Sequence, residues 1–101
     1  MVEDRRASGS IKAAEQRLIK AKNRAISMLT QIGYKAFHLP AIPFNVIAVR
    51  KREIRWILVL TDEITKDDEE AVKEFEVTDC CSREIWLKEF NKPGFRIRKY
   101  E

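Results

Sequence analysis

A stripe of apolar residues runs along the first third of the chain at the spacing of one helix face. These apolar positions recur every three or four residues after Ser10, which predicts an amphipathic helix. Ser10 is a suitable N-cap, and Gly33 stands where a glycine commonly ends a helix. The same spacing fits three heptads of a coiled coil, but its small alanines favour close packing on a sheet. The stripe consists of Ile11, Ala14, Leu18, Ala21, Ala25, Met28 and Ile32.

Two apolar runs in the middle of the chain predict a β-hairpin. Residues 44–49 and 54–61 are rich in β-branched side chains and apolar at nearly every position, the pattern of central strands covered on both faces. The charged segment 50–53 is the expected turn between them. A shorter strand is predicted at residues 34–39, and the prolines within residues 40–43 then impose an extended turn.

The rest of the chain predicts a second helix and two more strands. Thr65 precedes a cluster of acids suited to the first turn of a helix, and Val72 and its apolar neighbours give that helix a buried face. The other charges of this segment are expected to form a solvated face. Residues 84–90 and 95–100 are predicted as strands, and the Pro-Gly pair between them suits the central positions of a type II turn.

Together these elements predict a single α/β domain in the order αβββαββ. A chain of 101 residues is of single-domain size and long enough to bury one core. The expected architecture is one mixed β-sheet with flanking helices. The polar residues 1–9 are expected to be disordered.

Composition and charge narrow the function classes. No apolar run approaches the length of a membrane span, and the start MVEDRRASGS lacks the apolar core of a signal peptide, so we expect a cytoplasmic protein that does not engage a membrane.

Cys80 and Cys81 are adjacent and lack CxxC metal spacing, so we interpret them as ordinary thiols near a helix end, with a vicinal redox pair as the alternative. Residues 1–60 carry a net charge of +8, and residues 61–101 carry −4. The basic part either attracts a polyanion such as nucleic acid or is neutralised within the fold.

Four stretches of the sequence resemble the PD-(D/E)xK nuclease superfamily, in particular its small archaeal resolvase-like and restriction-endonuclease-like branch. They are IGYKAF, HLPAIPFNVIAV, IRWILVLTD and EIWLKEFNKPGFRIRKY, in the element order given above. The resemblance implies a restriction-endonuclease-like fold, DNA binding and a homodimer. In active members it implies an acid in the first helix, an Asp at the second strand and a Glu-x-Lys on the third, which hold Mg²⁺ and polarise the phosphate.

The matching positions in this chain lack most of that machinery. The helix acid falls on Glu15, which is kept, whereas the strand Asp falls on Asn45. The Glu and Lys of the third strand fall on Leu58 and Leu60, which offer nothing to a cation. We therefore predict that no residue at this site is catalytic, that no metal or other cofactor is bound, and that the leucines belong to the apolar core.

An alternative retains catalysis through relocated acids. Asp62 shares one strand face with Leu58 and Leu60, and Glu63 follows it. A metal site shifted onto these acids would make the chain a divergent Mg²⁺-dependent DNA endonuclease or resolvase. Asp62 and Glu63 equally suit a strand that ends at the protein surface.

Basic residues form a candidate nucleic-acid surface in two places, the charged turn and the polar side of the first helix. Both could contact backbone phosphates without reading sequence, and both also fit a solvated surface. Trp56 and Trp86 could stack bases, but their apolar strands favour core packing. We expect a catalytically degenerate nuclease-fold protein that binds nucleic acid or a partner subunit, with a divergent endonuclease and a structural interaction domain as alternatives. The predicted contacts are Lys12, Lys20, Arg50, Lys51, Arg52 and Arg55, and Arg17, Lys22 and Arg24 share the polar side of the helix.

Overall fold

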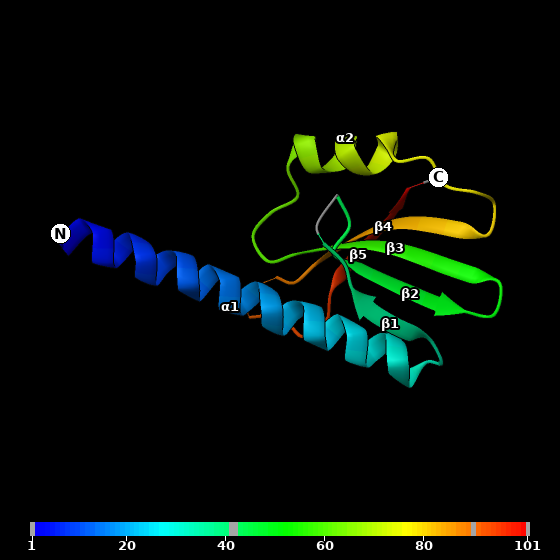
Figure 1. Cartoon of the computed structure of the whole chain (residues 1–101), viewed down its shortest axis with the longest axis horizontal. Helices are drawn as coiled ribbons and strands as arrows, with labels where there is room; N and C mark the ends of the chain where they lie inside the picture. The colour runs from blue at the N-terminus through cyan, green and yellow to red at the C-terminus, as the bar shows by residue number, and fades with distance from the viewer. Residues whose placement is uncertain (1, 41–42, 90, 101) are drawn as a thin grey trace.

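A five-stranded mixed sheet forms the centre of the protein, with one helix on each face (Figure 1). The computed structural model describes residues 2–40, 43–89 and 91–100, with side chains described from Lys12 onward. The expected turn through Ala41 and Ile42 lies outside these residues, as does Phe90 at the end of the expected fourth strand. In chain order the elements are α1 (Val2–Gln31), β1 (Lys35–His38), β2 (Val46–Arg50), β3 (Glu53–Leu60), α2 (Lys66–Glu74), β4 (Cys81–Leu87) and β5 (Arg96–Tyr100).

The strands lie side by side in the order β1-β2-β3-β4-β5, and only β3 and β4 run parallel. Parallel neighbours need a crossover connection, which α2 provides. Leu60 and Leu87 are paired at the ends of β3 and β4, so the residues that follow these two strands emerge at the same edge of the sheet. The predicted α/β class, the order αβββαββ and the single mixed sheet are confirmed.

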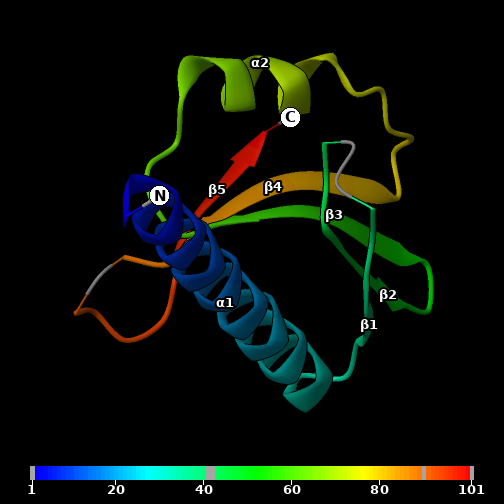
Figure 2. The same cartoon turned by 60° about the vertical axis from the view of Figure 1, so that its left-hand side comes forward.

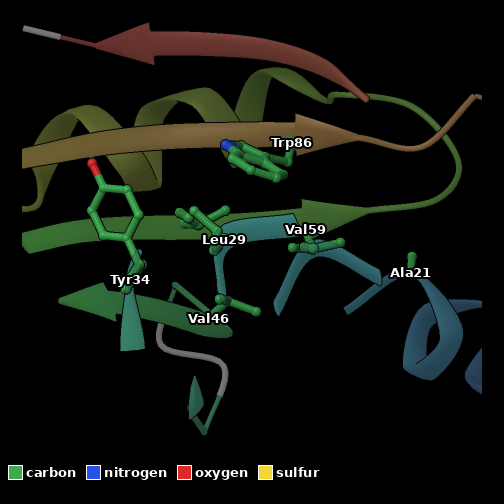
Figure 3. Close-up of a cluster of buried hydrophobic side chains, with 9 residues drawn as sticks. Ala21, Leu29, Tyr34, Val46, Val59 and Trp86 are labelled. Atoms are coloured by element: carbon green, nitrogen blue, oxygen red, sulfur yellow. The ribbon is translucent and has the colours of Figure 1, made fainter. Parts of the chain in front are cut away.

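Helix α1 packs on one face of the sheet through small side chains, as its alanines predicted. Ala21, Ala25 and Leu29 are buried against the sheet residues Val59 and Trp86 (Figure 3). Alanines allow the helix backbone to approach the strands closely, so this face of α1 belongs to the core of the domain. The burial of Trp86 likewise confirms core packing for this tryptophan.

Helix α1 begins at Val2 and runs past Ser10 without interruption. Ser10 therefore lies inside the helix, and the prediction that it caps the helix is wrong. Residues 3–7 combine good helix formers with acids close to the N-terminus, where acids stabilise a helix. The first part of α1 consequently projects beyond the sheet (Figures 1 and 2).

Helix α2 covers the opposite face and is capped as its sequence predicts. The Thr65 hydroxyl accepts a hydrogen bond from the Asp68 backbone N–H at 3.1 Å, and the Asp68 carboxylate accepts one from the Thr65 N–H at 3.0 Å. This reciprocal pair is a capping box. Val72 anchors the helix in an apolar cluster with Phe44 and Ile85. Neither of the helices described combines the length and the apolar character that a membrane crossing requires.

Candidate nucleic-acid interface at the sheet edge

Asn45 lies just before β2 and uses its side-chain amide to extend the sheet. Its Nδ2 donates a hydrogen bond to the Val59 carbonyl at 3.0 Å, and its Oδ1 accepts one from the Val59 N–H at 2.8 Å. The buried amide therefore pairs with β3 as a backbone peptide group would. Its oxygen already accepts from the sheet, and an ionised Asp at this position could not make the donating bond.

Leu58 and Leu60 lie in the apolar cluster beneath α2. Leu58 is buried beside Phe44, Val72 and Ile85, and Leu60 packs against the same cluster. Mg²⁺ prefers hard oxygen ligands, which hydrocarbon side chains do not supply. The residues at the mapped strand positions therefore do not fit the metal that the family resemblance implies.

An acidic groove of about 430 Å³ lies between α1 and the residues that follow β3. Glu15 of α1 lines it together with Asp62, Glu63 and Asp68. Asp68 is held by the capping box, and Asn45 is not among the lining residues. Across residues 2–40, 43–89 and 91–100, no three His, Cys, Asp or Glu side chains are arranged to hold a metal ion. Glu15, Asp62 and Glu63 therefore line the same groove, whereas Asn45, the residue at the position of the family's strand Asp, does not.

A basic groove of about 350 Å³ lies at the same sheet edge, between α1 and the residues that follow β3 and β4. Arg17, Lys20 and Arg24 reach it from consecutive turns of α1, and all three side chains are exposed. Their spacing of three and four residues places them on one side of the helix. The groove is bordered by both the helix and the sheet edge. Its remaining lining residues are Ala21, Thr61, Asp62, Lys88, Glu89 and Asn91.

Lys88 is the basic residue of this groove that sequence reasoning missed. It directly follows β4, and its backbone N–H donates to the Leu60 carbonyl at the end of β3. A strand–helix–strand pattern predicts parallel strands, whose carboxyl ends share an edge. The predicted strands at residues 54–61 and 84–90 are separated by a predicted helix, so they are expected to be parallel and to end at the same edge. This expectation places Lys88 near Asp62, so the position of Lys88 could have been predicted from the sequence.

Arg50, at the end of β2, and Arg55, in β3, are bonded to other groups of the protein. The Arg55 guanidinium donates two hydrogen bonds, of 2.8 and 2.6 Å, to the buried carboxylate of Glu84, and only 14% of its side chain is exposed. Arg50 donates to the Glu53 carboxylate and to the Ile32 carbonyl. These two arginines hold the turn to the rest of the fold, so we leave them out of the candidate interface.

The other predicted contacts fall into two separate places. Lys51 and Arg52 are exposed in the turn between β2 and β3, and Lys51 has the left-handed φ of 47°. The basic groove lies beyond the far end of β3, roughly 25 Å away for a strand of this length. Lys12 is exposed on α1 but does not line the groove. The two basic groups therefore lie at opposite ends of β3, whose course Figure 1 shows.

The Arg55–Glu84 pair is the most deeply buried charge pair among the described residues. Burial by itself would raise the pKa of Glu84, but hydrogen bonds from Arg55, Ser82 and Trp86 outweigh it and lower this pKa below its usual value. The bond to Glu84 in turn raises the pKa of Arg55. Both groups are therefore ionised at neutral pH.

Comparison with known proteins supports the fold. The structure is similar to Hjc of Archaeoglobus fulgidus, a Holliday junction resolvase from an archaeal hyperthermophile, with a TM-score of 0.64 and 16% sequence identity over 80% of this chain and 70% of Hjc. No protein-family model matches the chain, and no curated protein matches its sequence. The similarity to Hjc confirms the resolvase-like, restriction-endonuclease-like architecture that the sequence predicts.

Proposed function

We propose that this chain is a nuclease-fold protein that binds the phosphate backbone of nucleic acid and does not cleave it. The observation that carries the proposal is the basic groove, where Arg17, Lys20 and Arg24 present exposed cations beside the ends of two parallel strands. At the mapped metal positions, Asn45 is bonded to the backbone of β3 and Leu58 is buried among apolar side chains. The similarity to a Holliday junction resolvase supports DNA as the nucleic acid.

The chemistry of the groove suits phosphate. Guanidinium groups bind phosphate oxygens through two parallel hydrogen bonds, and the Lys20 ammonium acts as a point charge between them. Contacts of this kind fix a nucleic acid in place without reading its sequence. They also release counterions, so affinity falls steeply as salt concentration rises.

Fluorescence anisotropy with labelled duplex and four-way-junction DNA over a series of salt concentrations tests this proposal. The double variant Arg17→Ala/Lys20→Ala should reduce the slope of log Kobs against log salt by about 2, since each phosphate contact contributes roughly 0.9. The control Lys51→Ala/Arg52→Ala removes the same charge at the distant turn and should leave the slope unchanged.

Two results would contradict the proposal. An equal loss of slope in both double variants would show that net charge, and not the groove, governs binding. If wild-type protein binds no DNA at low salt, the nucleic-acid function is wrong, and the chain is better explained as a structural interaction domain.

A divergent metal-dependent endonuclease is the second candidate function. The observation that favours it is the acidic groove, where Glu15, Asp62 and Glu63 lie next to the basic one. Incubation of DNA with protein and Mg²⁺ or Mn²⁺ should yield no cleavage product, and calorimetric titration with Mn²⁺ should show no saturable binding. Cleavage, or Mn²⁺ binding that disappears in Asp62→Ala, would establish the enzyme instead.

We also propose that the functional unit is a homodimer, as the family resemblance implies. Two-fold dimers are the commonest homo-oligomers, and a dimer would present two basic grooves to one nucleic acid, which raises affinity through multivalency. Multi-angle light scattering of the full chain measures this directly. A monomer mass at the concentrations used for DNA binding would contradict it.

A further inference from the structure

Strand β1 forms one outer edge of the sheet (Figure 2). It pairs with β2 on one side, and among residues 2–40, 43–89 and 91–100 no strand pairs with its other side. The N–H and C=O groups on this free side are a template on which another extended chain can form hydrogen bonds. The opposite edge strand, β5, carries cations at three of its five positions, whereas β1 carries only Lys35. Strand β1 is therefore the less protected of the two edges.

The sheet face beside β1 is apolar and only partly covered. Phe37 of β1 lies opposite Ile47 of β2, which lies opposite Trp56 of β3. Residues directly opposite in paired strands point to the same face, and Trp56 packs in the cluster beneath α2. Phe37 and Ile47 share this face but lie outside that cluster, and Phe37 is 56% exposed. Val49 and Ile54 form the next row of the same face, and both are half-buried, so α2 leaves this part of the sheet without apolar cover.

Cations border this uncovered apolar face, which consists of Phe37, Ile47, Val49 and Ile54. Lys35 stands two residues before Phe37 in β1, so it points to the same face, and it is exposed. The turn after β2 adds the exposed Lys51 and Arg52 at the same end of the sheet. An apolar surface with a cationic end is complementary to a partner that combines apolar and acidic side chains.

We propose that the free edge of β1 binds an extended, acidic segment of a partner protein, which adds a strand to the sheet. Backbone hydrogen bonds to β1 supply affinity, and side chains at alternate positions supply specificity. An antiparallel segment places an apolar side chain opposite Phe37 and, two residues later, an acid opposite Lys35. A further acid, again two residues later, reaches the turn with Lys51 and Arg52. The segment is therefore of the form apolar-x-acid-x-acid.

The composition of the uncovered face favours a peptide over a single-stranded nucleic acid. Three of its four side chains are aliphatic, and aliphatic groups do not provide the aromatic surface on which bases stack. The site also does not depend on the proposed nucleic-acid function, because no residue of β1 lines the basic groove. Arg17→Ala/Lys20→Ala should leave peptide binding unchanged, so the two proposals can fail separately.

Fluorescence anisotropy of a labelled synthetic peptide with the core Ile-Thr-Glu-Thr-Glu, added to the full-length chain, tests the proposal. Phe37→Ser should weaken binding about tenfold or more, because the apolar contact is lost. Lys35→Glu should weaken it about tenfold and should favour a peptide with lysines in place of the glutamates, since like charges directly opposite in paired strands are destabilising. The control Ile97→Ser removes an exposed apolar side chain from β5 and should bind as the wild type does.

Four results would overturn the proposal. The wild type would bind the acidic peptide no better than the lysine peptide. Binding would survive Phe37→Ser or methylation of the peptide nitrogens that face β1. A short single-stranded DNA would displace the peptide, which would assign the face to nucleic acid. Phe37→Ser would convert a dimer to a monomer in light scattering without peptide, which would show that a second copy covers the edge. Phe37 is largely exposed, so the variant should fold, and far-ultraviolet circular dichroism verifies this.

Discussion

Two buried polar side chains, Asn45 and Glu84, form hydrogen bonds with groups of the sheet. Asn45 both donates to and accepts from the backbone of Val59, and Glu84 accepts from Arg55 and from the Trp86 indole. A buried group without such partners costs about 1–3 kcal/mol. The sequence marks Asn45 as an altered motif position, and the structure adds that its amide replaces a peptide group in the sheet.

Asn45→Asp should lower the free energy of unfolding by about 2–4 kcal/mol at pH 7. The new carboxylate would face the Val59 carbonyl without a proton to donate, and it would be charged and buried. A protonated acid can donate, so the loss should shrink as the pH falls toward about 4. Urea denaturation measures it, with exposed Gln16→Glu as the control. An equal effect in both variants would contradict the pairing.

Glu84→Gln should destabilise the protein by about 3–5 kcal/mol at pH 7, because it leaves the Arg55 charge without its partner. The pKa of Glu84 is lowered in the folded state, so its stabilisation is present above the ordinary value of 4.5 and is lost as the pH falls through the lower folded value. The deficit of the variant should therefore shrink in acid. Urea denaturation from pH 7 to pH 3 measures this, and exposed Glu74→Gln serves as control. A deficit that does not change with pH would argue against this role of the ionised carboxylate.

At the scale of elements, the sequence predicts a helix correctly where its apolar periodicity and its capping residues indicate the same ends. For α2 they agree, and Thr65 is the predicted N-cap. For α1 they disagree, because the helix-forming residues before Ser10 extend the helix past this candidate cap. Strand β4 starts at Cys81, earlier than the alternation at residues 84–90 indicated, so Cys80 and Cys81 lie at a strand start and the expectation of a helix end is wrong. Its first residues are ordered by pairing with β3, which no local pattern contains.

Thr65→Ala should lower the free energy of unfolding by about 1 kcal/mol, because it removes the side-chain half of the α2 capping box. For a domain of this size the corresponding fall in Tm is roughly 4–8 °C. Thermal unfolding followed by circular dichroism measures it. The control Thr65→Ser retains the hydroxyl and should stay within about 0.5 kcal/mol of the wild type. A Tm that falls equally in both variants would contradict a role for the hydroxyl.

Across the whole molecule, the charge asymmetry of the sequence persists after folding. The acidic second part pairs with its own cations, as in Arg98–Glu69 and Arg96–Glu89, while Arg17, Lys20 and Arg24 stay exposed on α1. These pairs neutralise part of the acidic region without using the basic helix. The positive charges of α1 therefore stay accessible from solvent, where they can attract a polyanion.

The basic side of α1 could be predicted from its sequence, because helical spacing places these cations on one face. The bond between Arg55 and the buried Glu84 could not be predicted. Glu84 lies 29 residues away in the sequence, and the two side chains meet only because β3 and β4 are paired. The same holds for Asn45, whose partner Val59 is set by the register of β2 on β3. Comparison with the family motif identified the positions where the catalytic residues are replaced. The hydrogen-bond partners of the replacing residues depend on strand pairing, which the sequence does not specify.

If the basic groove binds DNA, the complex should unfold at a higher temperature than the free protein. Ligand at 100 times Kd stabilises the folded state by about 2.7 kcal/mol, which for this size of domain raises Tm by roughly 10–20 °C. Fluorescence of Trp56 and Trp86, one in each apolar cluster, reports unfolding on both faces of the sheet. The rise should vanish at high salt and in Arg17→Ala/Lys20→Ala, whose groove has lost two cations, while Lys51→Ala/Arg52→Ala retains it. A rise that survives high salt would show that DNA is held by contacts other than phosphate pairing.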